Sequence, residues 1–145
     1  MNDRAAFEKV AVSDKQLYGP RKLLLAGFGP EAQQKFMQLL KMLGFSDLPL
    51  VWLSADQSET ALSELVSTAD GSGLGNTSEL PRSLIVCGIT ENELHRLIDG
   101  CRQAGMKQAL WAVLTPASEG WRLKDLLAEL AAEREAIATR KDRGV

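Results

Sequence analysis

The chain has 145 residues, of which 45% are hydrophobic and 25% charged, and its formal net charge is −2. This length and composition predict one globular domain with a core large enough to fold without a disulfide or a metal. The slightly negative charge argues against nucleic-acid binding, which needs clustered Lys and Arg. No apolar run is long enough to span a bilayer, so we expect no membrane partner.

The first residues lack clear periodicity, so we expect an arm (1–19), a single α/β domain (20–141) and a short carboxyl-terminal tail (142–145). The start of the chain carries acidic residues and no apolar stretch of the kind that marks a secretion signal. With only two cysteines, Cys87 and Cys101, these features predict free thiols in a reducing cytoplasm.

The first half of the domain predicts two strand–helix units. Lys22–Phe28 is apolar and predicts a strand, and Pro30 suits the first turn of a helix that Gly44 ends. Leu50–Ser54 predicts the second strand. A second helix is expected from Asp56 to about Ser67, because Asp56 and Glu59 have the spacing of a capping box. The glycine-rich stretch from Thr68 to Leu80 then predicts an exposed, flexible linker.

The second half repeats the alternation, although no internal repeat is evident from the residues. Ser83–Cys87 predicts the third strand, and Thr90 with Glu93 forms a capping box at the start of a helix. Ala109–Leu114 predicts the fourth strand. A long amphipathic helix should begin near Trp121, whose side chain we expect to pack the helix onto the sheet.

The order is therefore β-α-β-α-β-α-β-α, which predicts an α/β fold with a four-stranded, mostly parallel sheet covered by helices. Three helices separate the four strands, and each could serve as a crossover between parallel neighbours. The alternative is a ferredoxin-like split βαβ sheet with an extra carboxyl-terminal helix.

Residues Leu84 to Glu135 resemble a small bacterial family described only as a domain of unknown function. Its pattern is a strand ending in Thr-Pro, an Asn two residues later, then a Trp, and a helix ending in Glu-His. Thr115, Pro116 and Trp121 match that pattern, whereas Ser118 stands in place of Asn and Arg134 in place of His. The resemblance implies a fold and a bacterial, cytoplasmic origin, and it implies no activity.

A ligand site in an α/β sheet is expected at the carboxyl ends of the strands, where polar residues and turns follow. In a parallel sheet these positions would share one edge, whereas in a ferredoxin-like sheet they would separate. The candidates are Gly29, Ser54, Asp56, Cys87, Thr90, Thr115 and Ser118. Each also has a structural interpretation, as a turn, a helix cap or a buried apolar residue, and we favour that interpretation.

No constellation predicts catalysis or a resident metal. The lone histidine, His95, is expected to face water, and one His with two Cys is too few for a metal site. We expect no cofactor, and the sequence leaves open whether the chain is an enzyme. It favours a non-catalytic protein-interaction or regulatory module, with an unknown partner or self-association. The alternative is a small-molecule or anion-binding domain with its site at the strand ends.

Overall fold

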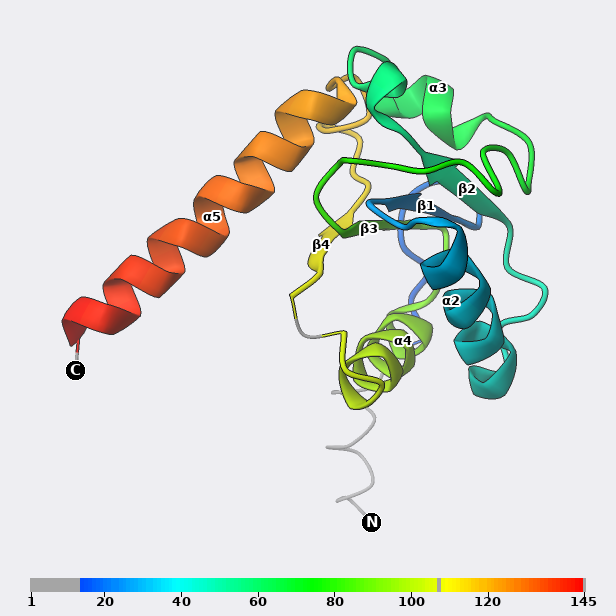
Figure 1. The fold of residues 1–145 in the computed structure, drawn as a ribbon, viewed down its shortest axis with the longest axis horizontal. Helices are drawn as coiled ribbons and strands as arrows, with labels where there is room; N and C mark the ends of the chain where they lie inside the picture. The colour runs from blue at the N-terminus through cyan, green and yellow to red at the C-terminus, as the bar shows by residue number, and fades with distance from the viewer. Residues whose placement is uncertain (1–13, 107, 145) are drawn as a thin grey trace.

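The computed structural model describes residues 14–106 and 108–144, with 138–144 as backbone only (Figure 1). Most of the expected arm, residues 1–13, lies outside the described residues. The predicted α/β class and mostly parallel sheet are confirmed. The elements are β1 Lys22–Ala26, α2 Pro30–Leu43, β2 Leu50–Leu53, a 3-10 turn Ala55–Gln57, α3 Leu62–Val66, β3 Ser83–Cys87, α4 Glu91–Gln103, β4 Leu110–Val113 and α5 Leu123–Gly144.

The four strands form a mixed sheet in the order β2-β1-β3-β4. β1 pairs with β2 in parallel, and β3 pairs with β4 in parallel, so α2 and α4 are crossovers between neighbouring strands. The central pair, β1 and β3, is antiparallel. The ferredoxin-like alternative is therefore wrong, because each crossover helix here joins two strands that lie side by side.

The direction of β3 is reversed by the segment between α3 and β3. Lys22 Nζ at the start of β1 donates to Val66 O over 2.7 Å, so α3 ends at the amino end of β1. The chain then runs back along β2, and Ser78 Oγ accepts from Gly27 N over 3.1 Å at the opposite edge. Because this return brings the chain to the carboxyl end of β1, β3 has to run in the opposite direction.

Helices cover both faces of the sheet, as the continuously apolar strands predict (Figure 1). On one face, α2 and α4 lie together over a core that includes Phe36, Leu40 and Leu97. On the other face, α3 and α5 pack against a core that includes Leu62 and Leu123. The second half of α5 extends beyond the sheet, and its side chains from residue 131 to 137 are exposed.

Several local sequence signals are confirmed. Pro30 opens α2, and Gly44 ends it with φ of 89°. The Thr90–Glu93 capping box is present, with Glu93 N donating to Thr90 Oγ1 over 3.1 Å and Thr90 N donating to Glu93 Oε1 over 3.0 Å. The single helix expected from Asp56 to Ser67 is wrong, because a 3-10 turn and the short α3 occupy that stretch.

The two halves of the domain repeat one β-α-β-α unit, although no internal repeat is evident from the residues. Residues 22–66 and 83–127 correspond at a constant spacing of 61 positions, from Gly27 to Gly88 and from Gly44 to Gly105, all with positive φ. The halves also exchange reciprocal hydrogen bonds: Leu62 N donates to Trp121 O, and Leu123 N donates to Thr60 O. A pseudo-two-fold axis between β1 and β3 therefore relates them.

Candidate interaction surface

The mixed sheet separates the expected ligand-site residues into two groups. Because β1 and β3 are antiparallel, the carboxyl ends of β1 and β2 lie at one edge of the sheet, and those of β3 and β4 lie at the opposite edge. The first edge carries Gly29, Ser54 and Asp56, and the second carries Cys87, Thr90, Thr115 and Ser118. The arrangement in which all seven share one edge is therefore wrong.

The polar residues after β2 and β4 bond within their own turns. Ser54 Oγ donates to Asp56 Oδ1, and Ser54 N donates to Gln57 Oε1 over 2.9 Å. At the pseudo-equivalent turn, Thr115 N donates to Ser118 Oγ over 3.0 Å, and Ser118 N donates to Thr115 Oγ1 over 3.1 Å. Neither Thr115 nor Ser118 caps α5, which begins at Leu123. These groups satisfy backbone N–H groups in tight turns.

Cys87 and Thr90, at the end of β3, also have structural roles. The Cys87 thiol is buried and donates to Lys22 O over 3.3 Å. Burial raises its pKa to about 11, with the Lys22 charge lowering it slightly, so the thiol is protonated at neutral pH. Thr90 caps α4. Both side chains are therefore engaged in contacts within the domain.

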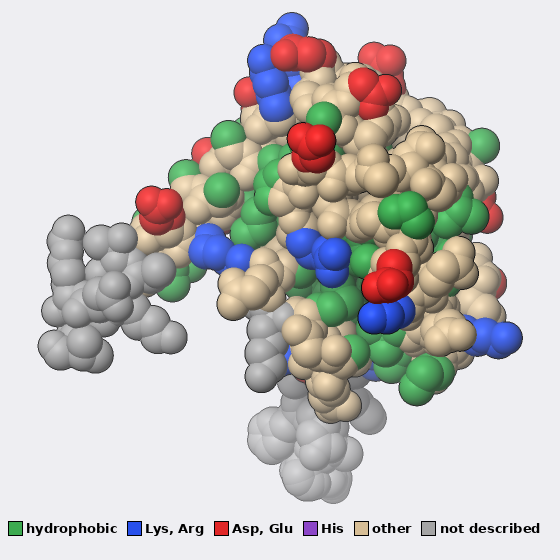
Figure 2. Space-filling view, in the orientation of Figure 1, with side chains coloured by type: hydrophobic (Ala, Val, Ile, Leu, Met, Phe, Trp, Pro, Cys, Tyr) green, Lys and Arg blue, Asp and Glu red, His purple; other side chains and the backbone are tan. Residues whose placement is uncertain are grey.

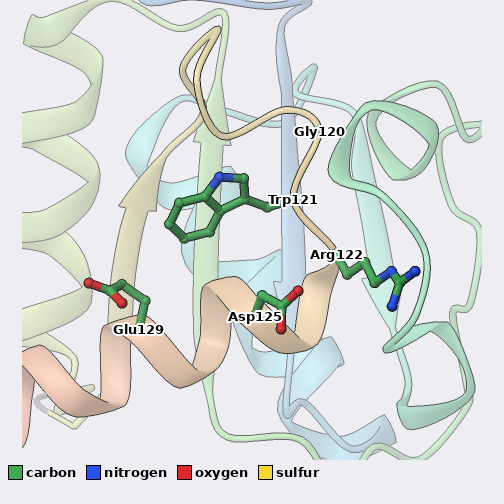
Figure 3. Close-up of a pocket in the computed structure, with 5 residues that line it drawn as sticks. All are labelled: Gly120, Trp121, Arg122, Asp125 and Glu129. Carbon is green, nitrogen blue, oxygen red and sulfur yellow. The ribbon is translucent and has the colours of Figure 1, made fainter.

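Trp121 occupies a different environment from the one expected. It was expected in the core, but 40% of its surface is exposed, so that expectation is wrong. The indole lies beside α5, on the same side as Asp125 and Glu129 (Figure 3). Together with Gly120 and Arg122 these residues line an open hollow of about 470 Å³.

The backbone on either side of Trp121 is held against the rest of the domain. Trp121 O accepts from Leu62 N over 2.9 Å, and two residues later Leu123 is fully buried against the sheet. The Trp121 side chain is nevertheless 40% exposed. Exposed large aromatic side chains are common at interaction surfaces, because their burial by a partner releases much apolar area from water.

The charged side chains around Trp121 differ in whether they have ion-pair partners among the described residues. Arg122 and Lys124 both donate to Glu59, at 3.1 Å and 2.7 Å, so those cations share one carboxylate. The hydrogen bond from Lys124 is the main reason that the pKa of Glu59 is lowered. Asp125 and Glu129 make no side-chain hydrogen bond or ion pair with the residues that the structure describes. The hollow therefore combines an aromatic ring with two carboxylates that have no partner in the described part of the chain.

A second hollow, between α2 and the end of α4, is smaller and more apolar. Phe28, Phe36, Leu39 and Met106 line it, and Arg82 lies over the Phe28 ring at 4.3 Å. Its volume is about 160 Å³. Pockets for drug-sized ligands usually measure roughly 300–1,000 Å³. This cavity is therefore too small to support the small-molecule alternative.

Within the described part of the chain, no group of three or more His, Cys, Asp and Glu side chains is arranged to hold a metal ion. No helix in that part has the length and apolar character needed to cross a bilayer. His95 is exposed, as the sequence predicts.

One of the comparisons with known proteins gave a match, and it covers the second half of the domain. No curated protein and no solved structure matched the chain. The resemblance inferred from the Thr-Pro strand end and Trp121 is confirmed at the level of the family, because residues 82–137, which comprise β3, α4, β4 and the larger part of α5, match the family described as Domain of unknown function (DUF3783).

Proposed function

We propose that the chain is a non-catalytic protein-interaction module, and that the surface formed by Trp121, Asp125 and Glu129 binds a positively charged side chain of a partner protein. The observation that carries this proposal is the exposed indole beside two carboxylates that lack partners among the described residues. We further propose that the module acts in the bacterial cytoplasm, where the free, buried thiols of Cys87 and Cys101 would stay reduced.

A Lys or Arg side chain fits this surface on physical grounds. A cation over an exposed Trp ring gains about 0.5–1 kcal/mol. Each exposed ion pair with a carboxylate adds about 0–1 kcal/mol. Asp125 and Glu129 are four residues apart and share one face of α5, so a single cation can approach both. The sum is modest, so a natural partner must make further contacts to bind tightly.

The test is a titration of the full-length protein, followed through the indole N–H signals of its three tryptophans by NMR. The probe is a tetra-arginine peptide, and a tetra-glutamate peptide is the matched control. We expect the Trp121 signal, assigned with a Trp121→Phe variant, to shift with the basic peptide only. The signals of Trp52, which is 4% exposed, should not move.

A double variant, Asp125→Asn with Glu129→Gln, separates charge recognition from simple aromatic contact. It keeps the shape of both side chains and removes their charge, so the affinity for tetra-arginine should fall about ten-fold, the equivalent of losing roughly 1.4 kcal/mol. Equal affinity of this variant and the native protein, or an equal response to tetra-glutamate, would contradict the proposal.

A further inference from the structure

We infer that residues 69–80 form a strap that opens from the outer edge of β2 and closes on it again while the rest of the domain stays folded, with Gln33 as its latch. This inference goes beyond the Trp121 surface and does not depend on it, because the strap belongs to the first half of the domain. The flexible linker predicted from the sequence is here bonded to the sheet and to α2.

The strap is a run of tight turns that depends on glycine. Gly71, Gly73 and Gly75 all have positive φ. Leu74 N donates to Gly71 O over 3.2 Å, and Asn76 N donates to Gly73 O over 3.1 Å. These turns set the shape of the strap, and hydrogen bonds to β2, to α2 and to the end of β1 set its position.

Backbone hydrogen bonds attach the first part of the strap to the outer edge of β2. Gly71 N donates to Leu50 O over 2.7 Å, and Trp52 N donates to Ser72 O over 2.8 Å. Leu50 N donates to Asp70 Oδ1 over 2.8 Å. The N–H groups of Leu50 and Trp52 that face away from β1 are therefore covered while the strap is closed, which protects an edge that could otherwise pair with another chain.

Gln33 of α2 holds the middle of the strap. Its side chain is 1% exposed, and its Oε1 accepts from Gly75 N over 2.7 Å. Its Nε2 donates to Asn76 O and to Phe28 O, each over 3.0 Å. Opening of the strap removes Gly75 and Asn76 from this amide and admits water in their place. The amide is then satisfied in both states, as a reversible latch requires, because release leaves no buried polar group without a partner.

Polar contacts hold the strap, and no side chain from residue 67 to residue 82 is buried. Leu74 is 46% exposed, and Leu80 is only partly buried. The net gain from one hydrogen bond is similar to the entropy cost of ordering one residue, and the strap has fewer hydrogen bonds to the rest of the domain than it has residues. A segment held in this way opens at a lower free energy than the core.

Both ends of the strap are fixed, so the opening is confined to residues 69–80. Before the strap, Lys22 Nζ donates to Val66 O over 2.7 Å and also to Thr68 O. After the strap, β3 begins at Ser83, which is fully buried. The strap can therefore leave β2 without displacing β1, β3 or α3.

The test is amide hydrogen exchange of the full-length protein labelled with ¹⁵N, measured by NMR at several denaturant concentrations below the unfolding transition. The reporters are the N–H groups of Trp52 and Gly75, which are bonded only while the strap is closed. The reference is Leu23 N, which donates to Pro49 O over 3.0 Å between β1 and β2. After correction for intrinsic rates, both reporters should exchange at least about 100-fold faster than Leu23. Their rates should depend little on denaturant, because opening exposes little surface.

Two results of this measurement overturn the inference. Equal protection of Trp52, Gly75 and Leu23, with equal denaturant dependence, would mean that the strap opens only when the whole domain unfolds. Different free energies of opening at Trp52 and Gly75 would mean that the attachments break separately and that the strap is not one unit.

Gln33→Met tests the latch, because it keeps the approximate length of the side chain and removes its donor and its acceptor. Both reporters should exchange about ten-fold faster, with a smaller change at Leu23. Gln34→Met makes the same substitution at the exposed neighbouring position and should leave the exchange rates unchanged. Equal exchange rates in the two variants would overturn the role of Gln33.

Gly73→Ala should prevent closure, because Gly73 has φ of 81° and the new Cβ would lie 2.1 Å from Trp52 O. Trp52 and Gly75 should lose most of their protection, while Leu23 stays protected and circular dichroism shows a folded domain. Gly71→Ala also replaces a glycine with positive φ, but no atom lies within 4 Å of its Cβ, so its effect should be smaller. Loss of protection at Leu23 equal to that at Trp52 would make strap and core one cooperative unit and would overturn the inference.

Discussion

Residues 22–66 and 83–127 build the same β-α-β-α unit, yet the first unit is closed at its outer edge and the second is open. In the first, the chain after α3 returns along β2 and is held there by Gln33, which is buried and accepts from Gly75 N over 2.7 Å. In the second, α5 runs on, Trp121 is exposed, and no described segment bonds to the outer edge of β4. The two units therefore share their core, whereas the segment after the last helix of each unit decides which edge of the sheet is covered.

The first way to test the comparison is at the glycines that follow β1 and β3. A Cβ at Gly27 would lie 2.6 Å from Leu80 O, and one at Gly88 would lie 2.4 Å from Arg21 N; both glycines have positive φ. Gly27→Ala and Gly88→Ala should each lower the free energy of unfolding by about 3 kcal/mol. Denaturant melts measure this. Gly29→Ala, with no atom within 4 Å of the new Cβ, should lower the free energy of unfolding by only a few tenths of that amount. A large loss at one of the pair and none at the other would break the correspondence.

A smaller effect is expected at Glu93, where the halves differ. Arg21 donates to Glu93 over 2.7 Å, and this hydrogen bond is the main reason that the pKa of Glu93 is lowered. The pKa of Glu93 is lower in the folded protein than in the unfolded chain. The stabilisation from the pair with Arg21 is therefore fully present above the unfolded-state pKa of Glu93, and it is lost as the pH falls through the folded-state pKa. The counterpart of Glu93 in the first half is Ala32, which has no charge to contribute.

Glu93→Gln should therefore remove about 1 kcal/mol of stability at pH 7 and less at pH 3, since the pair is partly exposed. Urea melts at the two pH values measure the difference. Glu91→Gln, in the same turn of α4, is the control and should keep the native pH dependence. An equal loss of stability at both pH values would mean that the pair between Arg21 and Glu93 does not cause the pH dependence.

The smallest effect is expected at Trp121. Since its side chain is 40% exposed, Trp121→Ala should cost about 1 kcal/mol or less and shift the melting temperature by only a few degrees. Leu123→Ala, two residues later at a fully buried position, should cost about 2–5 kcal/mol. Scanning calorimetry of the two variants makes the comparison, and a larger loss at Trp121 than at Leu123 would place the indole in the core.

The local features of the fold could be predicted because short-range chemistry specifies them. Pro30, Gly44 and the Thr90–Glu93 pair mark helix ends through φ preference and side-chain capping, which need no knowledge of distant residues. The strands could also be predicted, because each is a local run of apolar residues. The direction of β3 depends instead on where Asp70–Ser72 docks, and that stretch carries no strand pattern.

The candidate surface was missed for a related reason. A tryptophan before an amphipathic helix is usually buried, and its exposure here depends on how the turn before α5 docks against α3, which the local sequence does not specify. The repeat was hidden because the halves share few identities beyond turn glycines such as Gly27 and Gly88, while their core positions exchange one apolar residue for another.

The antiparallel ladder between β1 and β3 joins two units that are alike and are tethered only by the stretch from 67 to 82. The same β1–β3 pairing can also form between molecules, when the first unit of one chain (22–66) pairs with the second unit of another chain (83–127). Concentrated refolding is therefore expected to produce some domain-swapped dimers, with every native strand pairing retained and only the tether re-routed.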